Sequence, residues 1–294
     1  MKNIKSKYDM STSNHHNEVN KQLTQRPFAV VAAEIMAKFK PPAFPFPELT
    51  NYLYGWKKSS NFILSGEHSN AVSDLALAFG EYFATHAGPV IWIGCHSEII
   101  TIDGRLQSRE ARVERKGPAT YSLLDDAGKI ALTQAAMRID NLPLYVFDID
   151  QDIDSEFLEE LDEEIKTDAP TLIIVEPALF TESNLNPFQV PARRANLFQM
   201  IDLLQETNPD NRILWQLPLA KNSNNGESSM PSLDDLNEPR LVENADVVMF
   251  VQCPESATET NAELTIVQNK FGSLGTIAMT YDQKFSTWLE RTIH

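Results

Sequence analysis

Five short apolar segments, separated by segments with helical spacing, constrain the fold of this chain most strongly. They read NFILSG (61–66), PVIWIGC (89–95), LPLYVFDI (142–149), TLIIVEP (171–177) and RILWQLP (212–218). A strand that is apolar throughout is buried on both faces, and helices between successive strands allow the strands to run parallel. The pattern therefore predicts an α/β domain with a mostly parallel sheet between layers of helices.

Three further apolar segments follow near the carboxyl terminus, at 245–253, 262–270 and 275–282. They are too close together for a helix between each pair, so they predict a strand followed by an antiparallel hairpin. One helical segment, SEFLEELDEEIK (155–166), places its apolar residues on one stripe and most of its acids outside.

The amino-terminal part differs from the rest in composition. Residues 1–26 are rich in Asn, Ser, Lys and His, and we predict a disordered polar tail there. Residues 27–46 combine an amphipathic pattern with PPAFPFP, which predicts a linker helix and a proline-rich connector, because proline ends a helix. We assign 47–294 to one α/β domain. Its breaker-rich segments, 186–194 and 221–232, are predicted to be functional or mobile loops.

Charge limits the partners that this chain can have. The formal net charge is −16, and the tail carries five cations against two acids, so the remainder is about −19. Such a surface repels phosphate backbones, which disfavours sequence-independent binding of nucleic acid. No apolar run reaches the roughly 20 residues of a membrane span, and we expect a cytoplasmic protein. Cys95 and Cys253 lie in apolar runs and are interpreted as buried thiols without metal or redox function.

The turn after the first strand, GEHSNAVS (66–73), has the outline of a phosphate-binding loop. Gly66 and Ser73 occupy the first and last positions of Gly-x4-Gly-Lys-Ser/Thr, but Ala71 replaces the second glycine and Val72 replaces the lysine. Such a spacing match also arises by chance, so the turn alone identifies no nucleotide site.

Two later segments give the chain a resemblance to a family. PSLDDLNEPRLVENADVVMFV (231–251) is similar to a Pro-x-Leu-x-Asp-Leu segment followed by Ala-Asp-Val-Val, and VQNKFGSLGTIAM (267–279) is similar to a Lys-x-Arg-x-Gly-x-x-Gly element. In this order and spacing, residues 47–289 resemble the carboxyl-terminal motor domain of the DnaB-like hexameric replicative helicases, with some RadA-like features. The resemblance implies a RecA-like P-loop NTPase fold.

The resemblance also implies a set of site residues. The magnesium-associated acid falls on Glu176, the glutamine that senses the γ-phosphate falls on Gln216, and the cation that reaches a neighbouring subunit falls on Lys270. Arg193 and Arg194 lie where the family places DNA-contacting loops, although they could equally begin a surface helix. The phosphate loop itself falls on Gly66, Glu67, His68, Ser69, Asn70, Ala71, Val72 and Ser73.

Several of the implied catalytic groups are altered. Val72 lacks the charge that holds the β and γ phosphates, and Ala71 adds a methyl group where the backbone approaches them. The catalytic glutamate falls on His96, although a two-residue shift offers Glu98. The cation that would reach a neighbouring subunit's site is a lysine, Lys270, and not an arginine. Lysine lacks the planar guanidinium group that binds two phosphate oxygens at once.

Three hypotheses follow from these differences. The first is a catalytically degenerate motor domain without a metal site or functional cofactor, which binds a protein partner in replication or recombination, or itself, and binds DNA weakly. The second is an active helicase or recombination ATPase that uses ATP and Mg²⁺, with a lysine supplied from elsewhere, such as Lys57 or Lys58. The third is a scaffold unrelated to DNA, since a fold does not fix a function.

Overall fold

The computed structural model describes residues 41–94, 96–114, 120–148, 169–176, 190–219, 231–254 and 259–291. Its strands form a sheet with the order β3-β2-β4-β5-β1-β6-β7-β8-β9. Their bounds are β1 Asn61–Gly66, β2 Val90–Gly94, β3 Leu144–Asp148, β4 Leu172–Val175, β5 Arg212–Pro218, β6 Val247–Gln252, β7 Glu259–Asn269, β8 Gly275–Asp282 and β9 Thr287–Glu290.

The sheet changes from parallel to antiparallel at β6. Strands β3, β2, β4, β5, β1 and β6 pair in parallel, whereas β6–β7, β7–β8 and β8–β9 pair in antiparallel fashion. The predicted parallel sheet and terminal hairpin are therefore confirmed. Strand β9 was not predicted, because TWLE is short and carries no turn signal beyond the preceding polar residues.

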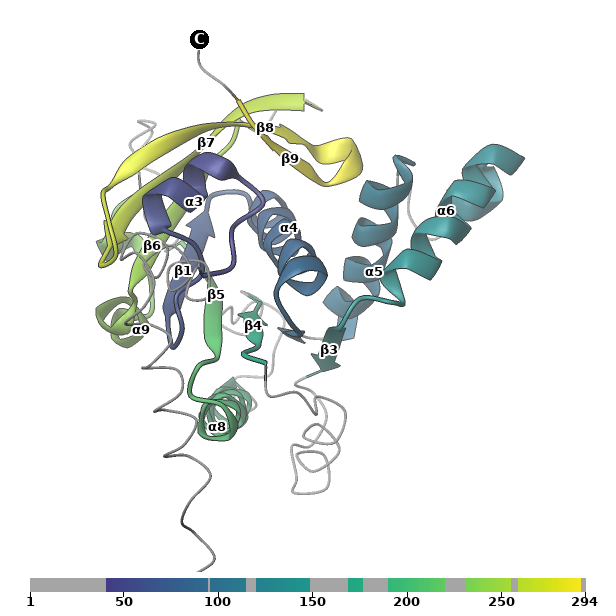
Figure 1. Cartoon of the computed structure of the whole chain (residues 1–294). Coiled ribbons are helices and arrows are strands. Elements are labelled where there is room, and N and C mark those ends of the chain that lie inside the picture. The colour runs from purple at the N-terminus through teal and green to yellow at the C-terminus, as the bar shows by residue number, and fades with distance from the viewer. Residues whose placement is uncertain are drawn as a thin grey trace, which may run out of the picture. The chain divides into compact units, whose positions relative to one another are not determined.

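Helices cover both faces of the sheet, and Figure 1 shows α4 on one side and α8 on the other. Helix α4 buries Leu75, Phe79 and Phe83, which recur every four residues and so share one face. Helix α8 buries Leu197, Ile201 and Leu204 against the opposite face. The helices are α3 Pro47–Leu53, α4 Ser69–His86, α5 His96–Ala111, α6 Asp126–Ile139, α8 Val190–Thr207 and α9 Pro239–Asn244, with 3₁₀ turns at Thr120–Leu123, Leu233–Asp235 and Gln283–Phe285.

Part of the predicted loop 186–194 is helical. Helix α8 begins at Val190 and includes Pro191, which a first helical turn tolerates because its missing N–H would have no intrahelical partner. Most of the second predicted loop, 221–232, lies outside the described residues, as do the tail, the linker helix and the predicted helix at 155–166.

The second half of the proline-rich connector packs into the domain. Phe44 and Phe46 are buried in the core on the α4 side, and the compact unit begins at Pro41. The ring of Phe44 stacks on Trp56 with centroids 4.2 Å apart, and the edge of Phe62 faces Trp56 at 4.7 Å. The folded core thus starts before residue 47, because these aromatic rings pack against Trp56, β1 and α4.

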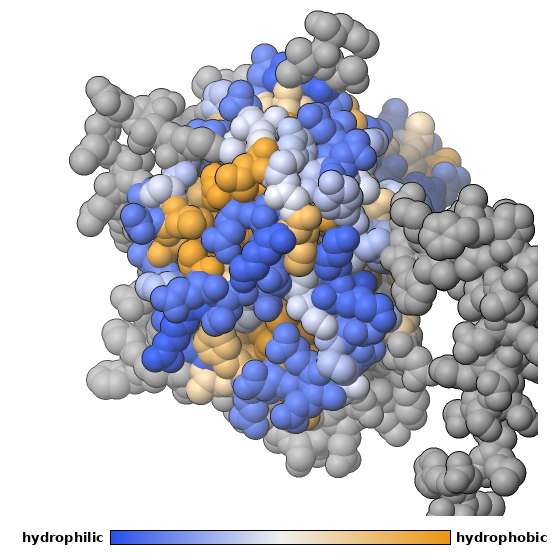
Figure 2. Space-filling view, turned by 60° about the vertical axis from the view of Figure 1, so that its left-hand side comes forward, coloured by the Kyte–Doolittle hydropathy of each residue, from blue (hydrophilic) through white to orange (hydrophobic). Residues whose placement is uncertain are grey.

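The face turned toward the viewer in Figure 2 is mostly hydrophilic, with several separate hydrophobic patches. Within the described part of the chain, no helix is both long enough and apolar enough to span a bilayer.

Candidate functional site

The strand, turn and helix predicted around the phosphate loop are present, but the turn is short. Strand β1 ends at Gly66 and α4 begins at Ser69, so only Glu67 and His68 lie between them. The first α-helical bond runs from the Val72 N–H to the His68 carbonyl, at 3.1 Å. The residues that the resemblance assigns to the second half of a phosphate loop therefore form the first turn of α4.

Val72, at the position of the missing lysine, faces the protein interior. Its side chain is 3% exposed and belongs to the core on the α4 side. A Cβ atom added to Gly66 would lie 3.0 Å from Val72 Cγ2 and 2.5 Å from the Val251 carbonyl oxygen. Gly66 is thus required by the close approach of β1 to Val72 and β6. This packing alone would account for a glycine at position 66.

The helix amino terminus is fixed by the carboxyl-terminal hairpin. The Trp288 indole N–H donates to the Ala71 carbonyl at 3.2 Å, and the Tyr281 ring stacks on Trp288 with centroids 4.6 Å apart. Ser73, whose hydroxyl the resemblance places near magnesium, is buried. Strands β8 and β9 therefore pack against the first turn of α4. This turn would have to move away from them to form an open phosphate loop.

Glu176 and Gln216 lie side by side toward the carboxyl ends of neighbouring strands. Glu176 follows β4 directly, and the register pairs Val175 with Trp215, which places Glu176 beside Gln216. Parallel α/β sheets bind their ligands at this edge. The two polar side chains that the resemblance singled out therefore share one location in the fold.

Both of these side chains are enclosed. Glu176 is 2% exposed, and its Oε1 accepts a hydrogen bond of 2.6 Å from the Trp92 indole N–H. A Cβ atom on Gly94 would lie 2.7 Å from Glu176 Oε2, so this glycine makes room for the carboxylate. Gln216 is 0% exposed, and within the described part of the chain neither of its amide atoms has a hydrogen-bond partner. A buried polar group without a hydrogen-bond partner lowers stability by about 1–3 kcal/mol. Packing alone therefore does not explain why a glutamine occupies position 216.

Lys270 lies at the other end of the sheet. Its Nζ is 3.4 Å from Asp246 Oδ1, and its side chain is 49% exposed. Asp246 precedes β6 and accepts a 2.9 Å bond from the Asn61 N–H at the start of β1. Gln268 donates to the Ala245 carbonyl at 2.7 Å. Both residues hold the amino ends of the central strands, so the chain does not bring Lys270 to Glu176 and Gln216.

The arginines of the predicted DNA-contacting loop lie near the amino end of α8. Arg194 forms an ion pair with Glu238, and nothing is described of the Arg193 side chain. Helix formation at this site agrees with the alternative that the pair begins a surface helix.

The suggested substitute lysines lie far from the phosphate loop. Lys58 pairs with Asp210, and Lys57 lies over the Tyr54 ring at 5.5 Å. Both precede β1, and a strand of this length spans about 20 Å, so they lie at the end of β1 opposite Gly66. His96 and Glu98 are in the first turn of α5, without described side chains.

Sequence reasoning missed a buried carboxylate one residue after Ser73. The Tyr281 hydroxyl donates to Asp74 Oδ2 at 2.6 Å, and Arg105 Nη1 lies 3.7 Å from Asp74 Oδ1. Burial raises the pKa of Asp74, against the opposing effects of Arg105, Tyr281, Arg109 and a hydrogen bond from Ser286. A charged residue inside the apolar pattern of α4 was the available signal, but its partner Tyr281 is distant in sequence.

Replacing Asp74 with asparagine is expected to change how stability depends on pH. Because the pKa of Asp74 is raised, the folded chain holds its proton to a higher pH than the unfolded chain does. Ionisation of Asp74 therefore lowers the free energy of unfolding as pH rises from the unfolded-state pKa to the folded-state pKa. The free energy of unfolding of Asp74→Asn relative to wild type should therefore increase as pH rises above the ordinary aspartate pKa of about 4, and level off once the raised folded-state pKa is passed. Urea denaturation across this range measures it. A constant difference between the two proteins would show that Asp74 ionises normally.

Two cavities lie along α4. One of about 190 Å³ adjoins the turn and is lined by residues 67–71, Cys253, Pro254, Tyr281 and Gln283. Ligand pockets usually measure about 300–1,000 Å³, so it is small for a nucleotide. Cys253, predicted to be buried, is half-buried here, and its thiol lies 3.8 Å from the Pro254 carbonyl.

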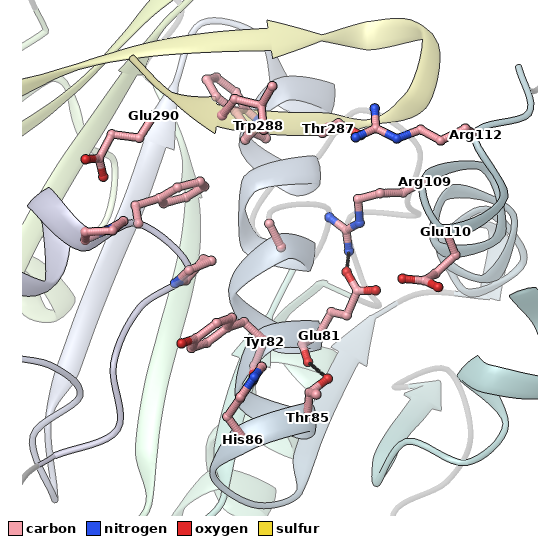
Figure 3. A pocket seen from close by; sticks show the side chains of 15 residues that line it. Glu81, Tyr82, Thr85, His86, Arg109, Glu110, Arg112, Thr287, Trp288 and Glu290 are labelled. Atoms are coloured by element: carbon pink, nitrogen blue, oxygen red, sulfur yellow. Dashed lines mark hydrogen bonds and ion pairs between the residues drawn. The ribbon is translucent and has the colours of Figure 1, made fainter. Parts of the chain in front are cut away.

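The larger cavity, of about 640 Å³, lies along the second half of α4, away from the phosphate loop. Figure 3 shows the Tyr82 ring against His86 and the Arg109 guanidinium bonded to Glu81. Burial raises the pKa of Glu81, and Arg109 opposes the shift. None of the predicted site residues lines this cavity.

The arrangement does not fit ATP and Mg²⁺. The lysine position is buried, the loop is a two-residue turn, and Glu176 is hydrogen-bonded to an indole inside the protein. What remains is an acid and an amide at the sheet edge, which can accept and donate hydrogen bonds only if this region opens.

Comparisons with known proteins agree with the fold. A solved structure described as an ATPase domain has a TM-score of 0.69 with 15% identity, covering 90% of this chain and 97% of that chain. A DnaB-like replicative helicase, solved with a description of its interactions with primase, has a TM-score of 0.67 with 16% identity, covering 89% of this chain and 65% of that chain. None of the curated proteins compared with the chain matches it.

The fold is RecA-like, with the nine-stranded sheet, the flanking helices and the terminal hairpin as described. The family model for the DnaB-like helicase C-terminal domain matches residues 43–290, which is most of the chain. The chain therefore belongs to the family of DnaB-like helicase C-terminal domains.

Proposed function

We propose that this chain is a catalytically degenerate DnaB-like motor domain that acts as a binding or regulatory protein in DNA replication or recombination. The observation that carries the proposal is the burial of Val72 at the position of the phosphate-loop lysine. A motor that hydrolyses ATP needs a positive charge near the β and γ phosphates, and loss of one strong donor alone slows such reactions by about 100 to 1,000 fold.

Further features support the loss of hydrolysis. Glu176 is engaged by Trp92, and Lys270 is engaged by Asp246 within the same chain. Val72, Ala71 and Trp288 also belong to one core cluster around the first turn of α4. We propose that ATP and Mg²⁺ are not functional cofactors of this chain.

The proposed partners are proteins. The domain would bind a replication or recombination protein, or further copies of itself through the family's RecA-type subunit surface, and it would act in the cytoplasm. The acidic surface, the ion pair of Arg194 and the net charge of −16 support weak or indirect contact with DNA.

A second function rests on Glu176 and Gln216. Their shared location at the carboxyl edge of the sheet favours an active ATP-dependent DNA helicase or recombination ATPase that opens this region when nucleotide binds. The first function remains our proposal, because the lysine position is buried and Arg105, a cation beside the loop, is engaged by Asn70 and Asp74.

The experiment measures nucleotide binding and phosphate release by the full chain, with and without single-stranded DNA. We expect no turnover above background, and no difference between wild type and Glu176→Gln. This variant is the matched control, because glutamine keeps an oxygen that can accept the Trp92 N–H but removes the acid. Turnover that DNA stimulates and that Glu176→Gln abolishes would establish the active helicase instead.

A further inference from the structure

The outer edge of strand β9 borders a cavity and no further strand of the described chain. Strand β9 is the last strand of the sheet, and all four of its residues line the cavity of about 640 Å³ beside α4 (Figure 3). The other walls are the second half of α4, the end of α5 and the connector residues 45–47. An unpaired strand edge is a template for a further strand, and an extended peptide can bind there by adding to the sheet.

The hydrogen-bond pattern of β9 leaves backbone groups available at this edge. The Arg291 N–H donates to the opposite Ala278 carbonyl at 2.9 Å, and bonded pairs alternate with non-bonded pairs along an antiparallel ladder. The N–H and C=O groups of Trp288 and Glu290 therefore point away from β8. In the described chain these groups have no backbone partner, so they can bond to an added strand.

The cavity also contains an arginine with unused donors. The Arg109 side chain is 10% exposed, and its Nη2 pairs with Glu81 and donates to the Leu77 carbonyl at 3.3 Å. Its Nε and Nη1 atoms have no hydrogen-bond partner in the described chain. A buried donor without an acceptor lowers stability. A ligand that brings oxygen atoms into the cavity would therefore form hydrogen bonds that folding leaves unmade.

The wall behind β9 is apolar. Side chains of directly opposite residues in paired strands lie on the same face of the sheet. Trp288 belongs to the core on the α4 side, so a residue opposite Trp288 would point toward Phe46, Ala78 and Tyr82, which line the cavity. An apolar side chain fits this position. A small anion would use Arg109 but neither the strand edge nor this wall, so the observations favour an extended peptide.

Most charged side chains along the middle of the cavity are already paired. Glu81 pairs with Arg109, and Arg138 Nε lies 2.8 Å from Glu110 Oε2. His86 lies at the end of the cavity that is farthest from β9 (Figure 3). The order of charges in a bound segment is therefore set by the two ends of β9.

An unpaired cation lies at the start of β9. Figure 3 shows the Arg112 guanidinium beside Thr287. It lies over the Phe285 ring at 5.9 Å, and no carboxylate pairs with it among the described residues. The neighbouring Lys284 and Glu114 pair with each other, so their charges cancel. This end of the groove therefore attracts an acidic side chain.

Acids predominate at the other end of β9. Glu290 Oε2 accepts the Glu48 N–H at 3.0 Å, and this bond leaves the charge of Glu290 in place. Glu48 adds a second acid, while the adjacent Arg291 donates through its Nε to the Met279 carbonyl at 3.0 Å. This end therefore attracts a basic side chain. Because β9 runs from Thr287 to Glu290, an antiparallel segment meets the acidic end first.

We propose that the edge of β9 binds an extended segment of a partner protein as an additional antiparallel strand. The segment has the order base-x-apolar-x-acid, with the base opposite Glu290, the apolar residue opposite Trp288 and the acid beside Arg112. This site adds to the proposed function and does not depend on it, because none of the predicted nucleotide-site residues lines the cavity. A chain that hydrolysed ATP would bind the segment equally well.

Fluorescence anisotropy of the full chain with a labelled peptide is the first test. The peptide has the core Lys-Thr-Leu-Thr-Glu between Gly-Ser flanks. We expect a dissociation constant of roughly 10–100 µM, because so short a segment buries less surface than a standard interface. The control peptide exchanges the two charges, Glu-Thr-Leu-Thr-Lys, and should bind about tenfold more weakly. Absence of saturable binding up to about 1 mM, or equal binding of both peptides, would overturn the proposal.

N-methylated peptides test the addition of a strand. Methylation of the leucine nitrogen removes the N–H that would bond the Trp288 carbonyl, and it should weaken binding by about tenfold or more. Methylation of the first threonine is the matched control, because a residue opposite Leu289 points its N–H away from β9. This peptide should bind nearly as well as the parent. Equal effects of the two methyl groups would show that the peptide does not pair with β9.

Arg112→Glu tests the location. Arg112 is exposed, and its replacement should weaken binding of the parent peptide by about tenfold and strengthen binding of the charge-exchanged peptide. Arg240→Glu is the matched control, since Arg240 is an exposed arginine on α9 that does not line the cavity. It should change neither affinity. Circular dichroism confirms that each variant is folded. Binding that Arg112→Glu leaves unchanged would place the peptide elsewhere and overturn the proposal.

Discussion

Replacing Val72 with lysine is expected to destabilise the domain by about 4 kcal/mol and to restore no ATPase activity. The ammonium group would enter a site that is 3% exposed, where burial disfavours the charged form by up to several pKa units. Each unit costs about 1.4 kcal/mol. The side chain is also longer than valine and must displace Gly66, Val251 or their neighbours.

Val72→Met is the matched control, because methionine has nearly the length of lysine without its charge. It should cost about 1–2 kcal/mol, from overpacking alone. Urea denaturation of both variants separates size from charge. The gap between them should widen as pH falls from about 9 to 6, because the buried amine has a lowered pKa and must lose its proton in the folded state.

The same substitution tests the shape of the loop. Combining Val72→Lys with Ala71→Gly restores the letters of the motif, but α4 would still begin at Ser69 and Trp288 would still bond the carbonyl of residue 71. We therefore expect no nucleotide turnover from the double variant. Stability equal to that of Val72→Met, together with tight ATP binding, would show that the side chain at position 72 reaches solvent.

Replacing Trp56 with alanine should cost about 4 kcal/mol of unfolding free energy. The indole is 0% exposed and lies among the rings of Phe44, Phe62, Phe79 and Phe83, at centroid distances of 4.2, 4.7, 5.9 and 6.1 Å. A large cavity in so rigid a cluster cannot collapse fully. The loss should also loosen the connector, because Phe44 would lose its stacking partner, although the bonds from the Trp56 N–H to the Pro42 carbonyl and from the Phe44 N–H to Thr50 Oγ1 would remain.

Trp56→Phe is the control, and it should lose about half as much stability. Among the described residues the indole N–H has no hydrogen-bond partner, so phenylalanine removes an unsatisfied donor while it keeps most of the ring contacts. Denaturant unfolding gives the free energies, and limited proteolysis near residues 41–46 reports the connector. Equal losses for the two variants would mean that the indole N–H does have a partner.

The parallel sheet, its covering helices and the terminal hairpin could be read from the sequence. Apolar runs and helical spacing are local properties, and burial on both faces permits few arrangements of five such strands. The resemblance singled out Glu176 and Gln216 one by one, and the parallel register of β4 and β5 places them side by side. The start of the folded core was harder to predict, because the partners of Phe44 and Phe46 are distant in sequence.

By itself, the sequence determined that this is an α/β chain with an altered phosphate-loop motif, since both follow from residue identity and spacing. Only the tertiary structure decided that Val72 faces inward, that Trp92 holds Glu176 from 84 residues away, and that Tyr281 holds Asp74 from 207 residues away. The physical reason is that a missing charge can be read from one position, but the direction of a side chain depends on the strands and helices that pack around it.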